Sequence, residues 1–216
     1  MEFDAACRRC PRLTRFLDEV RVSHPGYHAA PVPAFGVAHP SLLVVGLAPG
    51  MHGANRTGRP FTGDHAGLLL YQTLHKVGFA SRAESVAADD GLQLQGCRIT
   101  NAVRCLPPGN KPLPLEIQTC NGFLQDDLAA VLPGGAVLAL GRVAHEAVLR
   151  ALGQRLSAHP FAHGAEHGLG EGTRLFDSYH CSRYNTQTRR LTAEMFAQVV
   201  DRAGQWAREH SSPQHR

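Results

Sequence analysis

The chain has 216 residues and a formal net charge of +4. That length suits one domain with a core of its own, and the mild positive charge suits a polyanionic partner without requiring one. No apolar stretch is long enough to span a bilayer, and residues 1–4 lack the basic and apolar regions of a signal peptide. We therefore expect a single domain over 1–216 that is monomeric, cytoplasmic and free of membrane attachment. We also expect a frayed tail at 211–216 and cysteines that are reduced or metal-bound.

The order of the predicted elements indicates the fold class. A first helix is predicted at 13–22, after which apolar strands alternate with segments of helical apolar spacing. The predicted strands are the apolar run that starts at 42, then 98–103, 136–140 and 175–179; the later helices are 68–77, 115–132, 143–152 and 192–208. Segments 24–40, 80–96 and 157–172 are predicted loops, the last one mobile and rich in His and Gly. This alternation predicts a three-layer α/β/α sandwich with a central, mainly parallel four-stranded sheet.

Polar strings follow three of the four predicted strands, at 49–64, 101–105 and 180–188. In parallel sheets, ligands bind beyond the carboxyl ends of the strands. The topology brings all three strings to one edge of the sheet. We therefore expect the functional site at this edge.

The first of these strings is a long glycine-rich loop. Its glycines allow the backbone to approach a ligand closely and to take positive φ. Gly53 and Gly58 have the spacing of a phosphate-binding loop, but Arg59 and Pro60 stand where Lys and Ser or Thr are required. On spacing alone, the segment is either a binding loop or an irregular connection.

Four cysteines form a candidate metal site, a Cys7/Cys10 pair near the N-terminus and the distant Cys105 and Cys120. A redox-active C-x-x-C motif belongs within a βαβ unit, which this pair precedes. Four thiolates suit structural zinc or an iron–sulfur cluster, and the spacing leaves both open. Cys97, beside a predicted strand, is most simply a small core residue.

Several longer strings resemble the uracil-DNA glycosylase superfamily, most closely its fifth family, also called type B. The resemblance is carried by residues 46–49, 55–59 and 61–64 around the glycine-rich loop, by 103–112, 116–117 and Cys120, and by 178–188. It implies a monofunctional enzyme that flips uracil out of double-stranded DNA and breaks its N-glycosidic bond. Hypoxanthine and other deaminated bases are the implied secondary substrates. The alternative is a non-catalytic iron–sulfur module that binds damaged DNA.

The resemblance also implies roles for individual residues. His180 would donate a hydrogen bond to the departing base, as oxyanion-hole groups do, and Asn101 would bind the base edge. Leu47 stands where related families place an acidic or amide residue, so Asp64 is assigned to water positioning or cation stabilisation. Asp64 is equally suited to cap the helix that follows it. The implied substrate-binding residues are Gly46, Ala48, Gly50, Asn55, Phe61, Ser182, Arg183 and Asn185.

The same resemblance implies a structural [4Fe–4S] cluster on Cys7, Cys10, Cys105 and Cys120, with zinc as the alternative. No lysine occurs in the matching strings around the glycine-rich loop or at 178–188 to form a Schiff base, which argues against strand cleavage by a lyase step. Arg56 and Arg59 are either phosphate contacts or braces of the loop.

Overall fold

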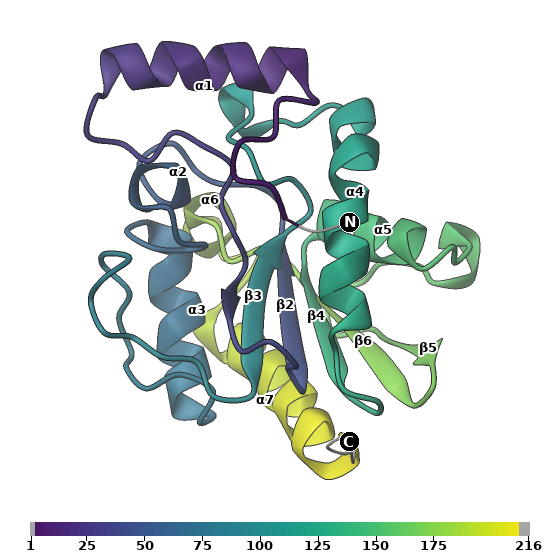
Figure 1. Ribbon diagram of the computed structural model, residues 1–216. Helices are drawn as coiled ribbons and strands as arrows, with labels where there is room; N and C mark the ends of the chain where they lie inside the picture. The colour runs from purple at the N-terminus through teal and green to yellow at the C-terminus, as the bar shows by residue number, and fades with distance from the viewer. Residues whose placement is uncertain (1–2, 212–216) are drawn as a thin grey trace.

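The computed structural model describes residues 3–211, so most of the predicted tail, 212–216, lies outside the described residues. Within 3–211 the chain forms a six-stranded sheet in the order β1-β3-β2-β4-β6-β5, with helices on both faces (Figure 1). The strands are β1 Phe35–Gly36, β2 Leu42–Gly46, β3 Cys97–Asn101, β4 Ala136–Leu140, β5 Glu166–Gly170 and β6 Thr173–Ser178.

The four middle strands, β3, β2, β4 and β6, pair in parallel, and this confirms the predicted parallel core of the sheet. Each edge carries an additional antiparallel strand, β1 on β3 and β5 on β6. The prediction of a loop across 157–172 is therefore wrong for β5. Its residues are exposed or half-buried in alternation, and an edge strand of Gly and His carries no apolar signal that a sequence pattern reveals.

Helices are assigned as α1 Pro11–Ser23, α2 Ala54–Thr57, α3 His65–Lys76, α4 Pro114–Ala129, α5 Arg142–Ala151, α6 Arg183–Gln187 and α7 Ala193–His210. Two short 3₁₀ helices span Pro108–Asn110 and Leu156–Ala158. The five predicted helices agree with α1, α3, α4, α5 and α7 to within a few residues. Side chains of Asp64, Ser182 and Thr192 accept from backbone N–H groups and start α3, α6 and α7.

The sheet has an apolar core on each face. Leu42 and Val44 of β2 pack in the core that includes α3 and α7, while Leu43 and Val45 pack in the core that includes α4 and α5. Successive strand residues point to opposite faces, so an uninterrupted apolar strand suits a sheet covered on both sides. Full burial of each such side chain contributes about 1.5–3 kcal/mol to folding.

Among residues 3–211, no helix is sufficiently long and apolar to cross a membrane.

Candidate functional site

A cavity of about 360 Å³ lies at the carboxyl ends of the parallel strands. The loops after β2, β3 and β6 all contribute to it, as the topology predicts. Its lining residues are Leu47, Ala48, Gly50, Ala54, Phe61, Asp64, Ala66, Asn101, Asn110, His180 and Ser182. The predicted residues Gly46, Asn55, Arg183 and Asn185 lie outside this lining, and each of them is placed below.

Gly46 allows two cavity residues to pack close together. A Cβ on Gly46 would lie 2.4 Å from Oδ1 of Asn101 and 2.6 Å from Cζ of Phe61. No side chain other than hydrogen fits such an approach. Oδ1 of Asn101 is buried and has no hydrogen-bond partner within residues 3–211. An orphan buried acceptor of this kind is rare in folded proteins and is a group that a ligand donor can satisfy.

Phe61 presents its ring to the cavity from a strained backbone. Its φ is 53°, in the left-handed region that bulky residues seldom occupy. The residue is 6% exposed, and the centroid of its ring lies 6.0 Å from that of His180 with an interplanar angle of 27°. Phe61 therefore belongs to the core and also forms a wall of the cavity.

His180 is half-buried, and desolvation lowers its pKa from 6.5 to about 4 because it disfavours the charged imidazolium. Its ring is therefore neutral near pH 7 and carries one N–H donor. The carbonyl oxygen of His180 accepts a hydrogen bond from Nδ2 of Asn185 at 2.8 Å. Asn185 thus holds the backbone of His180 from α6.

The two carboxylate oxygens of Asp64 have different surroundings. Oδ1 accepts a hydrogen bond from the backbone N–H of Gly67 at 2.9 Å, which caps α3. Oδ2 faces the glycine-rich loop, where a Cβ on Gly53 would lie 2.2 Å away and one on Gly50 would lie 3.5 Å away. Burial raises the pKa of Asp64, and the N–H groups of Gly67 and Ala66 oppose that rise. The residue caps a helix and also presents an oxygen to the cavity.

Arg59 is a brace of the glycine-rich loop. Its guanidinium is buried and donates to both carboxylate oxygens of Asp90, at 3.0 and 2.6 Å, and to Ser85 and Thr62 at 2.6 and 2.9 Å. Burial alone would raise the pKa of Asp90, but hydrogen bonds from Arg59 and backbone N–H groups hold it well below its usual range. Arg56 is exposed.

Asn55 lies in α2 and is fully buried. Neither its Oδ1 nor its Nδ2 has a hydrogen-bond partner within residues 3–211. Its backbone carbonyl accepts from the N–H of Ala29 at 3.0 Å.

The cavity also contains residues that sequence reasoning missed, namely Ala54, Ala66 and Asn110. Asn110 has a φ of 56° and ends a 3₁₀ helix after Gly109. A Gly-Asn pair in a Pro-rich segment is a signal for such a turn. Nothing in that signal indicates that the turn reaches the cavity.

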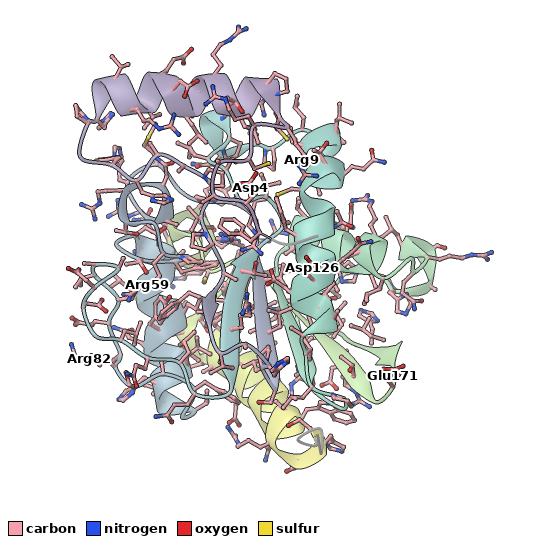
Figure 2. All side chains as sticks on the ribbon, viewed as in Figure 1. Asp4, Arg9, Arg59, Arg82, Asp126 and Glu171 are labelled. Atoms are coloured by element: carbon pink, nitrogen blue, oxygen red, sulfur yellow. The ribbon has the colours of Figure 1, made fainter. Side chains whose placement is uncertain are left out.

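The four predicted metal-ligating cysteines line one small hollow between the N-terminal segment, the loop after β3 and α4. Arg9 Nε donates to Sγ of Cys7 at 3.4 Å, and the backbone N–H of Arg104 donates to Sγ of Cys120 at 3.3 Å. In Figure 2, Arg9 lies beside sulfur atoms near the start of α4. Burial, followed by the neighbouring cysteines, raises the pKa of Cys105 to about 12. Cys97 is fully buried in the core, which confirms the expectation for it.

The spacing of these sulfur atoms bears on the kind of metal group they suit. Residues 3–211 contain a single group of three or more His, Cys, Asp or Glu ligand atoms that all lie within 4.8 Å of one another. That group lies elsewhere in the fold. A Zn–S distance of about 2.3 Å places tetrahedral ligands about 3.8 Å apart. The four cysteine sulfurs do not form such a group. Four thiols that line one hollow are a donor set that fits an iron–sulfur cluster.

The chain is similar to a known family over most of its length. The model of the uracil DNA glycosylase superfamily matches residues 33–204. The type-5 uracil-DNA glycosylase of Thermus thermophilus is 50% identical over 200 residues, which cover 90% of this chain and 91% of that protein. The type-5 uracil-DNA glycosylase of Pyrobaculum aerophilum is 43% identical over 201 residues, covering 91% and 87%. That of Mycobacterium bovis is 43% identical over 207 residues, covering 92% and 77%.

A type-4 uracil-DNA glycosylase of Sulfurisphaera tokodaii is less similar, 28% identical over 178 residues. The higher identity to the type-5 proteins agrees with the strings noted in the sequence. This chain therefore belongs to the uracil-DNA glycosylase superfamily, among the type-5 uracil-DNA glycosylases.

Proposed function

We propose that this chain is a monofunctional DNA glycosylase that flips uracil out of double-stranded DNA and excises it in base excision repair. It acts as a single-domain cytoplasmic monomer, residues 1–216. The names of the type-5 relatives support this activity. The observation that carries it is the meeting of Asp64, Asn101 and His180 in one cavity at the carboxyl edge of the sheet.

Recognition of uracil follows from the orphan acceptor of Asn101. Uracil in DNA carries one ring donor, N3–H, whereas N3 of cytosine is an acceptor. Because Oδ1 of Asn101 is buried and lacks a donor among the described residues, it favours the base that brings one. The ring of Phe61 supplies an apolar surface on which the flipped base stacks.

Bond cleavage requires stabilisation of charge on both fragments. As the C1′–N1 bond breaks, its electron pair moves into the base and negative charge develops at O2, while the sugar becomes cationic. The N–H of neutral His180 donates to O2. Oδ2 of Asp64 faces the loop side of the cavity, where it orients water toward C1′ and stabilises the cationic sugar. The water oxygen bonds to C1′, and the displaced base is protonated.

The remaining predicted binding residues fit supporting roles. Ala48, Gly50 and Ser182 line the cavity, and Gly46 makes room for its walls. Gly50 has no side chain, and the space that this leaves in the cavity wall admits hypoxanthine and other deaminated bases as secondary substrates. Arg183 is exposed at the start of α6, beside Ser182, and contacts a DNA phosphate. Among the described residues that line the cavity there is no lysine, which favours simple hydrolysis over lyase chemistry.

Cys7, Cys10, Cys105 and Cys120 hold a [4Fe–4S] cluster that ties the N-terminal segment to the loop after β3 and to α4. Four thiols that line one hollow support this assignment, with a structural zinc ion as the alternative. When bound, the cluster supplies a structural crosslink. The test measures the iron content, the zinc content and the visible absorption of anaerobically purified protein. Iron near four per chain supports the cluster, whereas one zinc without visible absorption refutes it.

The proposed activity is tested by release of free base from duplexes that carry one uracil, with matched duplexes carrying cytosine or thymine at the same position. We expect release of uracil and no release of cytosine, whose N3 is an acceptor; the thymine duplex measures how far the cavity tolerates a base with the same N3–H and an added methyl group. Binding of the uracil duplex without release of base would instead indicate a non-catalytic damage-binding module.

A further inference from the structure

A second group of ligand-type side chains lies outside the cavity, on the other side of β6. It consists of His145 of α5, His167 of β5 and Asp177 of β6. Their ligand atoms all lie within 4.8 Å of one another. Nδ1 of His145 is 2.8 Å from Oδ1 of Asp177, and Nε2 of His167 is 3.2 Å from Oδ2. The side chain of Asp177 has no exposed area, and those of His145 and His167 are 2% and 10% exposed.

The surroundings of His145 determine which of its nitrogens is protonated. Nε2 lies 2.8 Å from the backbone carbonyl oxygen of His159. A carbonyl oxygen only accepts, so Nε2 carries the hydrogen. In the neutral ring, Nδ1 then presents a lone pair to a carboxylate oxygen of Asp177. Two acceptors 2.8 Å apart and shielded from water require a cation between them, either a proton or a metal ion.

His159 itself extends this arrangement. Its ring centroid lies 5.4 Å from that of His167. Its Nδ1 faces the carbonyl oxygen of Arg155 at 3.2 Å, so Nε2 is the nitrogen left as an acceptor. Metal-ligating histidines commonly donate their other ring N–H to a backbone carbonyl, which fixes the tautomer. His145 and His159 both show this pattern.

We propose that these residues form a structural site for a divalent transition-metal ion of the zinc type. His145 Nδ1, His167 Nε2 and a carboxylate oxygen of Asp177 are the ligands, and the ring of His159 lies beside that of His167. Imidazole with carboxylate is a donor set that zinc accepts. A divalent ion also offsets the charge of a carboxylate that has no contact with water.

The position of the site indicates what it does. It joins α5, the turn after the 3₁₀ helix Leu156–Ala158, β5 and β6, which lie side by side at one edge of the molecule (Figure 1). Asp177 lies three positions before His180 in the chain. The ion would therefore hold the edge hairpin and its preceding loop against the strand that leads into the cavity. The inference rests on this geometry and not on the activity proposed above.

The test uses untagged holoprotein with its cysteine site loaded, dialysed against a chelator under conditions in which the visible absorption of the protein is unchanged. Zn²⁺ is then titrated by calorimetry, and Co²⁺ is titrated with optical detection. Nitrogen and oxygen ligands give cobalt bands without the intense thiolate charge-transfer absorption that cysteine ligands produce. The two readouts thereby separate this site from the cysteine site.

His167→Gln is the main variant, because His167 is the least buried of the three ligands and its replacement is tolerated best. His163→Gln is the matched control, since His163 lies in the same segment but contacts the N–H of Tyr179 at 3.1 Å. Circular dichroism checks that both variants are folded. We expect one Zn²⁺ per wild-type chain, a thermal midpoint that rises with Zn²⁺ concentration, and binding weakened at least about tenfold in His167→Gln but unchanged in His163→Gln.

The proposal is overturned if wild-type protein takes up no zinc beyond its cysteine site, or if His167→Gln binds zinc as tightly as wild type. It is equally overturned if the cobalt complex shows thiolate charge transfer. In each of these cases a proton, and not a metal ion, bridges His145 and Asp177.

Discussion

Gly53 and Asp64 lie so close together that a Cβ on Gly53 would be 2.2 Å from Oδ2 of Asp64. The absence of a side chain at Gly53 therefore lets this oxygen take its place beside the loop, while Oδ1 caps α3 through Gly67. The glycine-rich string thus accommodates a carboxylate, and the phosphate-loop spacing within it is incidental.

Gly53→Ala should displace Asp64 and lower the rate of uracil release by about 100-fold, the scale of a misplacement of about 1 Å at a catalytic group. Gly26→Ala is the control, because a Cβ there would have no heavy atom within 4 Å and Gly26 does not line the cavity. Single-turnover release assays compare the two variants. Equal rates in both would show that the position of Oδ2 does not matter for the reaction.

Asn101→Ala should reduce uracil release by about tenfold, the effect of one lost hydrogen bond. The same change should not lower the thermal midpoint in the absence of DNA, because Oδ1 has no partner within residues 3–211 to lose. A simple structural role predicts the opposite pattern. Unfolding monitored by circular dichroism beside the release assay distinguishes the two.

The pH dependence should follow the neutral state of His180. The pKa of His180 is about 4 in the folded protein, against 6.5 for the free side chain. The ring is therefore neutral from pH 6 to pH 9, a range that begins roughly two units above the folded pKa. His180 should therefore impose no pH dependence on release in that range, because its ring keeps a single N–H donor throughout.

The same shift has a consequence for stability. Between 4 and 6.5 the unfolded chain binds a proton at His180 that the folded chain does not, so folding is favoured as pH rises. This contribution to the free energy of unfolding is complete above pH 6.5 and is lost as pH falls toward about 4. Measured by urea unfolding, the free energy of unfolding of wild type should fall relative to that of His180→Gln between pH 7 and pH 5. A constant difference in unfolding free energy would contradict a neutral, desolvated His180.

Arg183→Ala should weaken binding to duplexes with and without uracil alike, because a phosphate contact carries no base information. The slope of log affinity against log salt should fall by about one. Arg150 is a matched control on a different part of the surface, where it pairs with Glu146 at 2.9 Å. Salt titrations of binding by fluorescence anisotropy measure both variants, and an unchanged slope in Arg183→Ala would remove this residue from the DNA contacts.

Much of the site could be predicted because backbone connectivity determines it. Parallel strands bring their carboxyl ends together, so the loops that hold Phe61, Asn101 and His180 had to meet. Side-chain partners across the fold carry no such local signal. Arg59 pairs with Asp90 and His145 with Asp177, 31 and 32 positions away, and neither pair follows from spacing.

The edge of the sheet was the main error in the fold. β5 is rich in Gly and half-exposed, and its pairing with β6 rests on backbone hydrogen bonds that any sequence provides. The histidines of that segment belong to the stretch predicted as a mobile loop. His167 instead contacts a buried carboxylate, because the strand pairing turns its side chain inward.

The most direct measurement is single-turnover release of uracil from a duplex by wild type, Asp64→Asn and His180→Ala. Asn is an N-cap as favourable as Asp, so Asp64→Asn keeps the cap of α3 and removes only the charge. We expect wild type to release uracil and both variants to be slower by at least about 100-fold with thermal midpoints near that of wild type. Wild-type rates in both variants would contradict the assignment of this cavity as the site of base excision.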